Sequence, residues 1–189
     1  MIDPLRVTDF DRSQEGLEVF WIFCVVVAGK NADSMAEAVR RLLGGRPPGQ
    51  RPLAYLASLG PRLHDALVAS RTGQYRRIAR ALAESFDLDL AGAALERLEQ
   101  VHGVGPKTAR YFVLHTRARA RVAVLDTHLL KWLKRRGLPA VPPHTPGSRK
   151  RYLELESRAI LAMERAFPNM TLAQADLHIW ATTSGRTAP

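Results

Sequence analysis

The feature that most constrains the fold of this 189-residue chain is a helical pattern of apolar residues that recurs about every fifteen to twenty residues. Gly or Pro separates one pattern from the next, and strand-like alternation is rare. The sequence therefore predicts an all-α protein. The expected helices cover residues 14–28, 33–43, 52–59, 61–69, 74–85, 93–101, 106–115, 127–136, 150–167 and 172–183.

Two segments between these helices have the composition of loops. Residues 44–51 are rich in Gly and Pro, and residues 137–148 contain four prolines. The stretch 138–147 has two interpretations, because proline both blocks helix formation and stiffens the chain. It is either a linker between domains or a long surface loop within one body.

The charge balance points to a polyanionic partner. Twenty-eight Lys and Arg against eighteen Asp and Glu give a net charge of +10 and a pI near 10.6. Nucleic acid is the first candidate for such a partner. The excess is concentrated in residues 107–151, which hold twelve Lys and Arg against a single acid, Asp126. A charge run is usually a solvated face, but this one adjoins a candidate phosphate-binding turn.

Two further features exclude whole classes of protein. Cys24 is the only cysteine, so a disulfide within the chain, a four-cysteine iron–sulfur cluster and a cysteine-rich zinc site are excluded. The longest apolar run, residues 19–28, is shorter than the roughly 20 residues needed to cross a bilayer, and it lies behind acidic residues, unlike a signal peptide. We expect a buried helix there, in a cytoplasmic protein without a membrane partner.

A glycine-containing turn, residues 102–105 (HGVG), joins two of the expected helices, the second of which begins at Pro106. Glycine allows positive φ and a close approach of backbone amides to a ligand. The helix N-terminus adds unpaired N–H groups and a positive dipole end. The turn therefore suits one DNA phosphate, whatever the base sequence. A Gly-x-Gly turn also serves as an ordinary connection between helices.

Asp126 follows the apolar stretch 122–125 and precedes the amphipathic helix 127–136. One interpretation is a helix N-cap, for which Asp is among the best residues. Lys107 lies nineteen residues earlier, at the start of the helix after the turn, and an antiparallel return of the chain would bring the two side chains together. An amine beside a carboxylate in a basic cleft is a nucleophile with its proton acceptor. Alternatively, Lys107 is one more cation that faces phosphate.

Residues 98–132, LEQVHGVGPKTARYFVLHTRARARVAVLDTHLLKW, combine a hairpin of the form x-G-V-G-x-K-T-A with V-x-x-x-D-T-H. In this combination the sequence resembles the helix-hairpin-helix superfamily of DNA glycosylases, of the endonuclease III type. The small size, the stretch VAVLDTHLLKWL, the sequence Tyr152-x-x-Leu-Glu and the stretch DLHIW at 176–180 are most similar to the small 8-oxoguanine DNA glycosylase/lyases typical of archaea. The cluster cysteines of endonuclease III are absent, which indicates a cluster-free branch.

The resemblance implies that Asp126 is the aspartate essential for base excision and Lys107 the amine nucleophile of the bifunctional members. It also implies a hairpin that holds a DNA phosphate, and a histidine, His128, near the backbone at the lesion; the alternative for His128 is a surface or capping residue. The hairpin residues expected at DNA are His102, Gly103, Val104, Gly105 and Thr108, with the amides of Gly103, Gly105 and Thr108 on the phosphate and an alkali ion compatible with the carbonyls of Glu99, Val101 and Val104.

Four more residues are candidates for contact with a flipped nucleotide. Tyr111 lies four residues after Lys107 on the same helix face and could stack on an extruded base, and Trp180 could do the same. Core packing is the alternative for both. Lys30 and Asn31 end the first apolar helix, where related glycosylases insert a polar side chain into the gap left by flipping. A helix terminus with Asn as its cap explains them equally well.

The resemblance further implies two helical lobes with a helix-hairpin-helix motif and the active site in the cleft between them. A helical-barrel domain over residues 15–115 ends in the hairpin, and residues 1–14 and 116–189 form a second lobe with Asp126. The implied protein is a monomeric, nucleoid-associated base-excision-repair enzyme without a cofactor. It removes an oxidised purine from double-stranded DNA by base flipping and Schiff-base β-elimination, which requires a deprotonated lysine and a carboxylate but no metal or redox group.

Two other functions remain open at this point. One is a monofunctional glycosylase that uses water against another damaged or mismatched base, with Lys107 serving only phosphate. The other is a non-enzymatic helix-hairpin-helix DNA-binding module. The module explains the charge and the turn but leaves the position of Asp126 unexplained.

Overall fold

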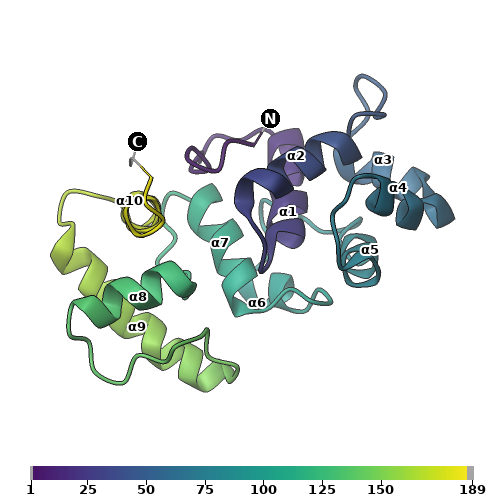
Figure 1. Ribbon diagram of the computed structural model, residues 1–189. Coiled ribbons are helices and arrows are strands. Elements are labelled where there is room, and N and C mark those ends of the chain that lie inside the picture. Colours follow the sequence, from purple (N-terminus) through teal and green to yellow (C-terminus); the bar gives the residue numbers. More distant parts are fainter. Residues whose placement is uncertain (1, 187–189) are drawn as a thin grey trace. The chain divides into compact units, whose positions relative to one another are not determined.

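The structure, a computed structural model, describes residues 2–186, and no β-strand occurs among them (Figure 1). The prediction of an all-α protein is confirmed. None of the helices in this range is both long and apolar enough to cross a membrane. The elements are α1 (Gln14–Val27), α2 (Ala32–Leu42), α3 (Pro52–Ser58), the 3₁₀-helix η1 (Gly60–Arg62), α4 (Leu63–Ala69), α5 (Tyr75–Ala83), α6 (Leu95–Glu99), α7 (Pro106–Thr116), α8 (Thr127–Arg135), α9 (Arg149–Ala166) and α10 (Leu172–Thr183).

The helix boundaries differ from the expected ones where local backbone geometry intervenes. Residue Gln74 has a left-handed φ of 47°, so α5 begins one residue later than expected. The helix expected over 61–69 is divided into η1 and α4. The helix expected over 93–101 is only five residues long: it begins after Ala94, which has an extended conformation (φ −60°, ψ 152°), and it ends at Glu99.

The chain divides into two compact units. The first unit comprises the residues up to Val7 together with 11–109. The second comprises residues 8–10 together with those from Arg110 onward. The boundary falls inside α7, so the first turn of this helix belongs to the first unit and the remainder to the second.

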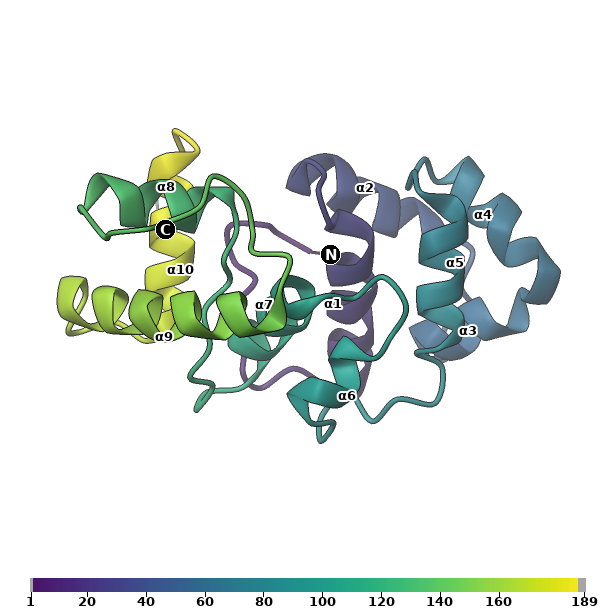
Figure 2. The same cartoon turned by 90° about the horizontal axis from the view of Figure 1, so that it is seen from below.

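Helix α1 forms the centre of the first unit. Its consecutive residues from Phe20 to Val26 are all buried, as expected for the apolar run, and the helix contacts α2, α3 and α5 (Figures 1 and 2). The Trp21 indole N–H donates to the Ser85 hydroxyl over 2.9 Å in this core. A helix that is hydrophobic all round is stable only when it is surrounded in this way.

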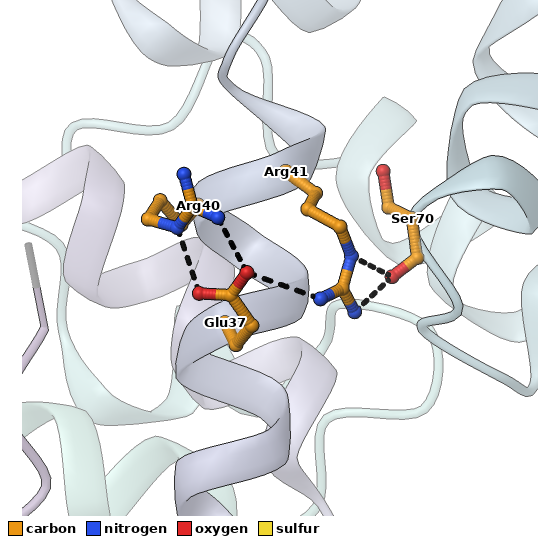
Figure 3. A network of polar contacts seen from close by, with 4 residues as sticks. All are labelled: Glu37, Arg40, Arg41 and Ser70. Atoms are coloured by element: carbon orange, nitrogen blue, oxygen red, sulfur yellow. Dashed lines mark hydrogen bonds and ion pairs between the residues drawn. The ribbon is translucent and has the colours of Figure 1, made fainter.

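A polar network joins α2 to the end of α4 (Figure 3). Arg41 donates from Nη2 and Nε to the Ser70 carbonyl at 2.9 and 3.3 Å and from Nη1 to Glu37 at 3.2 Å. Glu37 also accepts from Arg40, whose hydrogen bond lowers the pKa of the Glu37 carboxyl. Because Ser70 caps α4, the network anchors the chain just before the turn that leads into α5.

The second unit is built from the remainder of α7, from α8, α9 and α10, and from the segment before α8. Figure 2 shows α9 crossing α10, and α10 contacts both α8 and α9. The core contains the apolar faces of these helices, with the Trp132 and Phe167 rings stacked at 5.8 Å. Ala123 and Leu125 from the segment before α8 lie in the same core.

The proline-rich segment 138–147 is a loop of the second unit and not a linker between domains. Val141 is buried in the core of that unit, and the Thr145 hydroxyl donates to the Leu125 carbonyl over 2.7 Å. The residues on both sides of the segment belong to the same unit. Of the two interpretations of this stretch, the surface loop is confirmed.

Candidate active site and nucleic-acid interface

The hairpin between α6 and α7 has the expected form, with one correction. Gly103 has a φ of +70°, and a Cβ there would lie 2.7 Å from Cγ of Arg77. Gly105 does not have a positive φ, and a Cβ there would meet no atom within 4 Å. Positive φ therefore requires glycine at only one of the two positions. The open space at Gly105 leaves its backbone accessible to a ligand.

The backbone amides expected at a phosphate are not engaged within the protein. Among residues 2–186, no acceptor is hydrogen-bonded to the amides of Gly103, Gly105 or Thr108. The last of these lies in the first turn of α7, where helix geometry leaves N–H groups without an intrahelical partner. The hairpin thus offers several N–H groups and the positive end of a helix dipole to an anion.

Carbonyl groups of the same hairpin were expected to suit an alkali ion. The Val101 oxygen accepts the Val104 amide over 2.9 Å, and a carbonyl oxygen has a second lone pair that remains for a cation. No group of three or more His, Cys, Asp or Glu side chains suited to a metal occurs among the described residues. A cation here would depend on backbone oxygens, namely those of Glu99, Val101 and Val104.

A side chain of α5 and one from its C-cap residue hold the hairpin turn in place. The Arg77 guanidinium donates from Nη1 to the Gly103 carbonyl at 3.1 Å and from Nη2 to the Val25 carbonyl at 2.8 Å. Glu84 accepts the His102 amide over 2.7 Å, and this bond lowers the pKa of the Glu84 carboxyl. Desolvation lowers the pKa of Arg77. Neither residue was predicted from the sequence, because neither is distinguished by spacing or composition.

Lys30 and Asn31 lie beside the end of α1 that Arg77 contacts. The Lys30 amine donates to the Val26 carbonyl over 2.8 Å, next to the carbonyl taken by Arg77. Desolvation, followed by the positive charge of Arg77, lowers the pKa of Lys30 to about 8. Asn31 is the N-cap of α2 and accepts the Ser34 amide over 3.0 Å, so the capping interpretation of Asn31 is confirmed.

Lys107 lies in the first turn of α7 and is half-buried. The helix begins at Pro106, as expected for a proline at the first helical position. No ion pair between Lys107 and a carboxylate is found among residues 2–186. Its amine is therefore not occupied by an internal counter-ion. It belongs to the first unit, with the hairpin and Lys30.

Asp126 is the N-cap of α8, in an extended conformation with φ −89° and ψ 179°. Its Oδ1 accepts the amides of His128 and Leu129 at 2.9 and 2.8 Å. The capping interpretation is thus confirmed. The cap is compatible with a chemical role. The two amides on one carboxylate oxygen hold the half-buried group in a single orientation, as a group that acts on a bound substrate requires.

His128 and Trp180 lie together in the second unit, close to the start of α8. The His128 Nδ1 atom is 3.0 Å from the Thr183 hydroxyl, which itself donates to the Ile179 carbonyl over 2.5 Å. Because its proton serves the Ile179 carbonyl, the Thr183 hydroxyl has a lone pair for an N–H of His128. The rings of His128 and Trp180 are 6.1 Å apart, edge to face, and the Arg186 guanidinium lies 5.0 Å from the Trp180 ring centre.

Tyr111 is half-buried on α7, with its ring 5.0 Å from that of His115, edge to face. The buried His115 ring is held on one side by the Thr8 hydroxyl at 2.8 Å and faces the Asp176 carboxylate at 3.4 Å on the other. Neither Tyr111 nor Trp180 is fully enclosed in the core. Asp126, His128, Tyr111 and Trp180 all belong to the second unit.

Comparison with known proteins shows which solved structures this chain is similar to. No family model matches the chain. The structure is similar to that of the 8-oxoguanine DNA glycosylase of Thermotoga maritima, with a TM-score of 0.69 and 25% identity over 95% of this chain and 85% of that one. It has the fold of the Methanocaldococcus jannaschii 8-oxoguanine DNA glycosylase, with a TM-score of 0.69 and 20% identity over 97% and 86% of the two chains.

A third similar structure is the M. jannaschii 8-oxoguanine glycosylase/lyase in complex with a 15mer DNA that contains 8-oxoguanine. Its TM-score is 0.58, with 24% identity over 96% of this chain and 88% of that one. The similarities extend over nearly the whole of both chains and agree with the helix-hairpin-helix resemblance read from residues 98–132. The expected fold is therefore confirmed.

Proposed function

We propose that this chain, which has the fold of helix-hairpin-helix DNA glycosylases, is a base-excision-repair DNA glycosylase with AP lyase activity that removes 8-oxoguanine from double-stranded DNA. The observation that carries the proposal is the chain-long similarity to the T. maritima 8-oxoguanine DNA glycosylase at 25% identity. The net charge of +10 provides the electrostatic attraction that a DNA-binding protein needs.

The hairpin binds the DNA backbone in this proposal. The amides of Gly103, Gly105 and Thr108 donate to one phosphate, and the N-terminus of α7 adds its dipole. Arg77 and Glu84 support this function indirectly, because each hydrogen-bonds a backbone group of the turn itself. Phosphate contacts fix the register of the protein on the duplex and carry no base information.

Gly105→Ala is expected to weaken binding to all duplexes by about tenfold, damaged and undamaged alike, because the new methyl group stands where the phosphate approaches. The protein should fold normally, since a Cβ at this position meets nothing within 4 Å. Fluorescence anisotropy against both duplexes measures the effect. Gly147→Ala, at an equally open position, is the control. If Gly105→Ala bound DNA with unchanged affinity, the hairpin would not be part of the DNA interface.

The nucleotide that carries the lesion is flipped out of the duplex, because its glycosidic bond cannot be reached inside the base stack. Tyr111 and Trp180 offer half-buried aromatic faces on which the extruded base stacks. The Lys30 amine faces a phosphate beside the gap that flipping leaves. Asn31 uses its Oδ1 to cap α2, and its Nδ2 group faces the same gap. His128 contacts the backbone at the lesion from the N-terminus of α8.

Lys30 makes part of the DNA affinity dependent on pH. Its pKa of about 8 means that the amine loses its positive charge as the pH rises through that value. The affinity of the wild type for an undamaged duplex should therefore fall by about threefold between pH 7 and 9.5. A nearby phosphate favours the charged amine and moves the midpoint upward.

Two substitutions at Lys30 isolate this effect in binding titrations across the same pH range. Lys30→Arg keeps its charge throughout and should bind at the level that the wild type has at pH 7. Lys30→Met should bind at the level that the wild type has at pH 9.5. If the DNA affinity of the wild type changed with pH no more than that of Lys30→Arg, Lys30 would not face phosphate.

The chemical step rests on Asp126 and Lys107. Cleavage of the bond between C1′ and the base nitrogen builds positive charge on the sugar, which the Asp126 carboxylate stabilises. The deprotonated Lys107 amine adds to C1′, and the purine leaves with the bonding electron pair and a proton. The lone pair of the lysine nitrogen then breaks the C1′–O4′ bond, O4′ takes up a proton from water, and the sugar ring opens to a protonated Schiff base. This Schiff base makes a C2′ proton acidic. Its removal expels the 3′ phosphate and cuts the strand, without a redox or metal cofactor.

Borohydride trapping across a panel of duplexes tests the proposal. The wild type should form a covalent adduct with DNA that contains 8-oxoguanine or an abasic site, and none with undamaged DNA. Release of 8-oxoguanine without an adduct would favour a monofunctional glycosylase. Binding without either reaction would favour a DNA-binding module.

Sedimentation of the free protein and of its complex with DNA tests the proposal that the protein acts as a monomer.

A further inference from the structure

The segment that leads into Asp126 has no neighbouring strand. Residues 122–125 belong to no helix and no sheet, and Ala123, Val124 and Leu125 are buried. Buried backbone N–H and C=O groups need hydrogen-bond partners, and in an extended chain these usually come from an adjacent strand. For Ala123 and Leu125 they come from side chains, whereas the Val124 carbonyl accepts the Asp126 amide over 2.7 Å.

Three side chains satisfy the backbone polar groups of Ala123 and Leu125. The Glu156 carboxylate accepts the Ala123 amide at 3.0 Å, and the Tyr152 hydroxyl donates to the Ala123 carbonyl at 3.0 Å. The same Tyr152 hydroxyl accepts the Leu125 amide at 3.1 Å, and the Thr145 hydroxyl donates to the Leu125 carbonyl at 2.7 Å. All four groups of the two residues are therefore held, directly before Asp126.

Tyr152 is the centre of this arrangement. Its side chain is fully buried on α9, and its hydroxyl both donates and accepts. Burial raises the pKa of Tyr152 well above its ordinary value, so the hydroxyl keeps its proton and remains a donor at any working pH. The Arg110 guanidinium lies 4.7 Å from the Tyr152 ring centre and fixes the ring from the other side.

Glu156 connects the segment to helix α7. Its Oε1 accepts both the Arg110 Nε at 2.6 Å and the Ala123 amide at 3.0 Å. Arg110 lies three residues after Lys107, on the same helix. A buried ion pair of this kind contributes little net stability compared with an apolar pair. We therefore infer that it serves to hold Arg110, Glu156 and the Ala123 backbone in fixed positions relative to one another.

We propose that Tyr152, with Glu156 and Thr145, is a positioning residue that fixes Asp126 for base release by clamping the backbone of residues 123–125. Asp126 itself makes two hydrogen bonds through Oδ1 to the start of α8. The clamp fixes the chain on the other side of the same residue. The proposal rests on the role of Asp126 in the proposed function.

The decisive variant is Tyr152→Phe, which removes one hydroxyl and keeps the ring beneath Arg110. Single-turnover base release from an 8-oxoguanine duplex, at saturating enzyme, is expected to fall by at least about tenfold. The Kd for the same duplex should stay within about twofold, because the hydroxyl faces the core and not DNA. A variant that was only destabilised would not show this combination of a lower rate and an unchanged Kd.

Ser85→Ala is a matched control. The Ser85 hydroxyl is also fully buried, accepts one hydrogen bond from Trp21 and donates one to Ala81, but it lies in the first unit. A similar loss of thermal stability with an unchanged rate is expected. Amide exchange at Ala123 and Leu125, followed by NMR, should accelerate in Tyr152→Phe and remain at the wild-type rate in Ser85→Ala.

A double variant tests whether Tyr152 acts through Asp126. In the Asp126→Asn background, Tyr152→Phe should change the residual rate by less than about twofold, since the group being positioned has lost its charge. Should Tyr152→Phe not fold, Thr145→Val, which deletes one bond from the surface loop, is expected to lower the rate by about threefold with an unchanged Kd.

The outcomes separate this inference from the proposed function. An active wild type with a Tyr152→Phe variant of equal rate would overturn the inference alone. A full further loss in the double variant would also overturn it, because Tyr152 would then act independently of Asp126. A wild type that releases no 8-oxoguanine would overturn the proposed function and, with it, the positioning of Asp126 for base release.

Discussion

Asp126→Asn is expected to lower the rate of 8-oxoguanine release by at least about a thousandfold while the protein remains folded and bound to DNA. Asparagine caps a helix as well as aspartate does, and its oxygen can accept the amides of His128 and Leu129 in the same way. Only the negative charge is lost. Because that charge stabilises the cationic sugar in the transition state, the loss falls on the chemical step.

Single-turnover excision and duplex affinity, measured on the same preparation, separate the two effects. Affinity should stay level or increase, since a negative charge is removed near phosphate. Asp126→Ala serves as the comparison: it should lose the cap as well, at a cost of about 1 kcal/mol in stability, without a much larger loss of rate. If Asp126→Asn excised 8-oxoguanine at the wild-type rate, Asp126 would be a helix cap and would have no role in the chemical step.

Lys107→Gln is expected to abolish both the borohydride-trapped adduct and strand cleavage at an abasic site. Glutamine has nearly the helix propensity of lysine and offers no nucleophilic amine, so α7 should form as before. The abasic substrate tests the amine without a requirement for any particular lesion. Gel analysis of the reduced complex detects the adduct, and thermal unfolding verifies the fold.

Because the chain has few lysines, the nucleophile can be assigned to a single residue. The chain has five, at Lys30, Lys107, Lys131, Lys134 and Lys150. Lys131→Gln, on the exposed face of α8, is the control and should form the adduct at the wild-type level. Peptide mapping of the wild-type adduct should locate the modification at Lys107. Full trapping in Lys107→Gln would assign the nucleophile to another amine.

Local sequence determined much of the structure described here. Patterns of apolar residues and Gly/Pro interruptions predicted the helices, because amphipathicity and helix termination depend on residues within a few turns. The same holds for Asp126 as the cap of α8, since the amides that it accepts belong to the next three residues. The hairpin was likewise visible, although positive φ proved necessary at Gly103 and not at Gly105.

Contacts between distant segments were beyond what local patterns could predict. The Glu156 carboxylate bonds groups 46 and 33 residues away, and Arg77 reaches Gly103 across 26 residues. One signal was present in the sequence. Glu156 is an acid on the helix face that otherwise buries Leu155, Ala159 and Ile160, and a charge on such a face needs a buried partner.

The sequence by itself determined the helical class, the hairpin, the basic character and the two residues proposed for the chemistry. Each depends on composition or on residues close together in the chain. Only the tertiary structure decided that the loop 138–147 belongs to the second unit, that α5 holds the hairpin turn, and that side chains of α9 take the place of a neighbouring strand beside Ala123 and Leu125. The reason is physical: a buried polar group must find a partner, and its partner is whichever segment the packed core brings within hydrogen-bond distance.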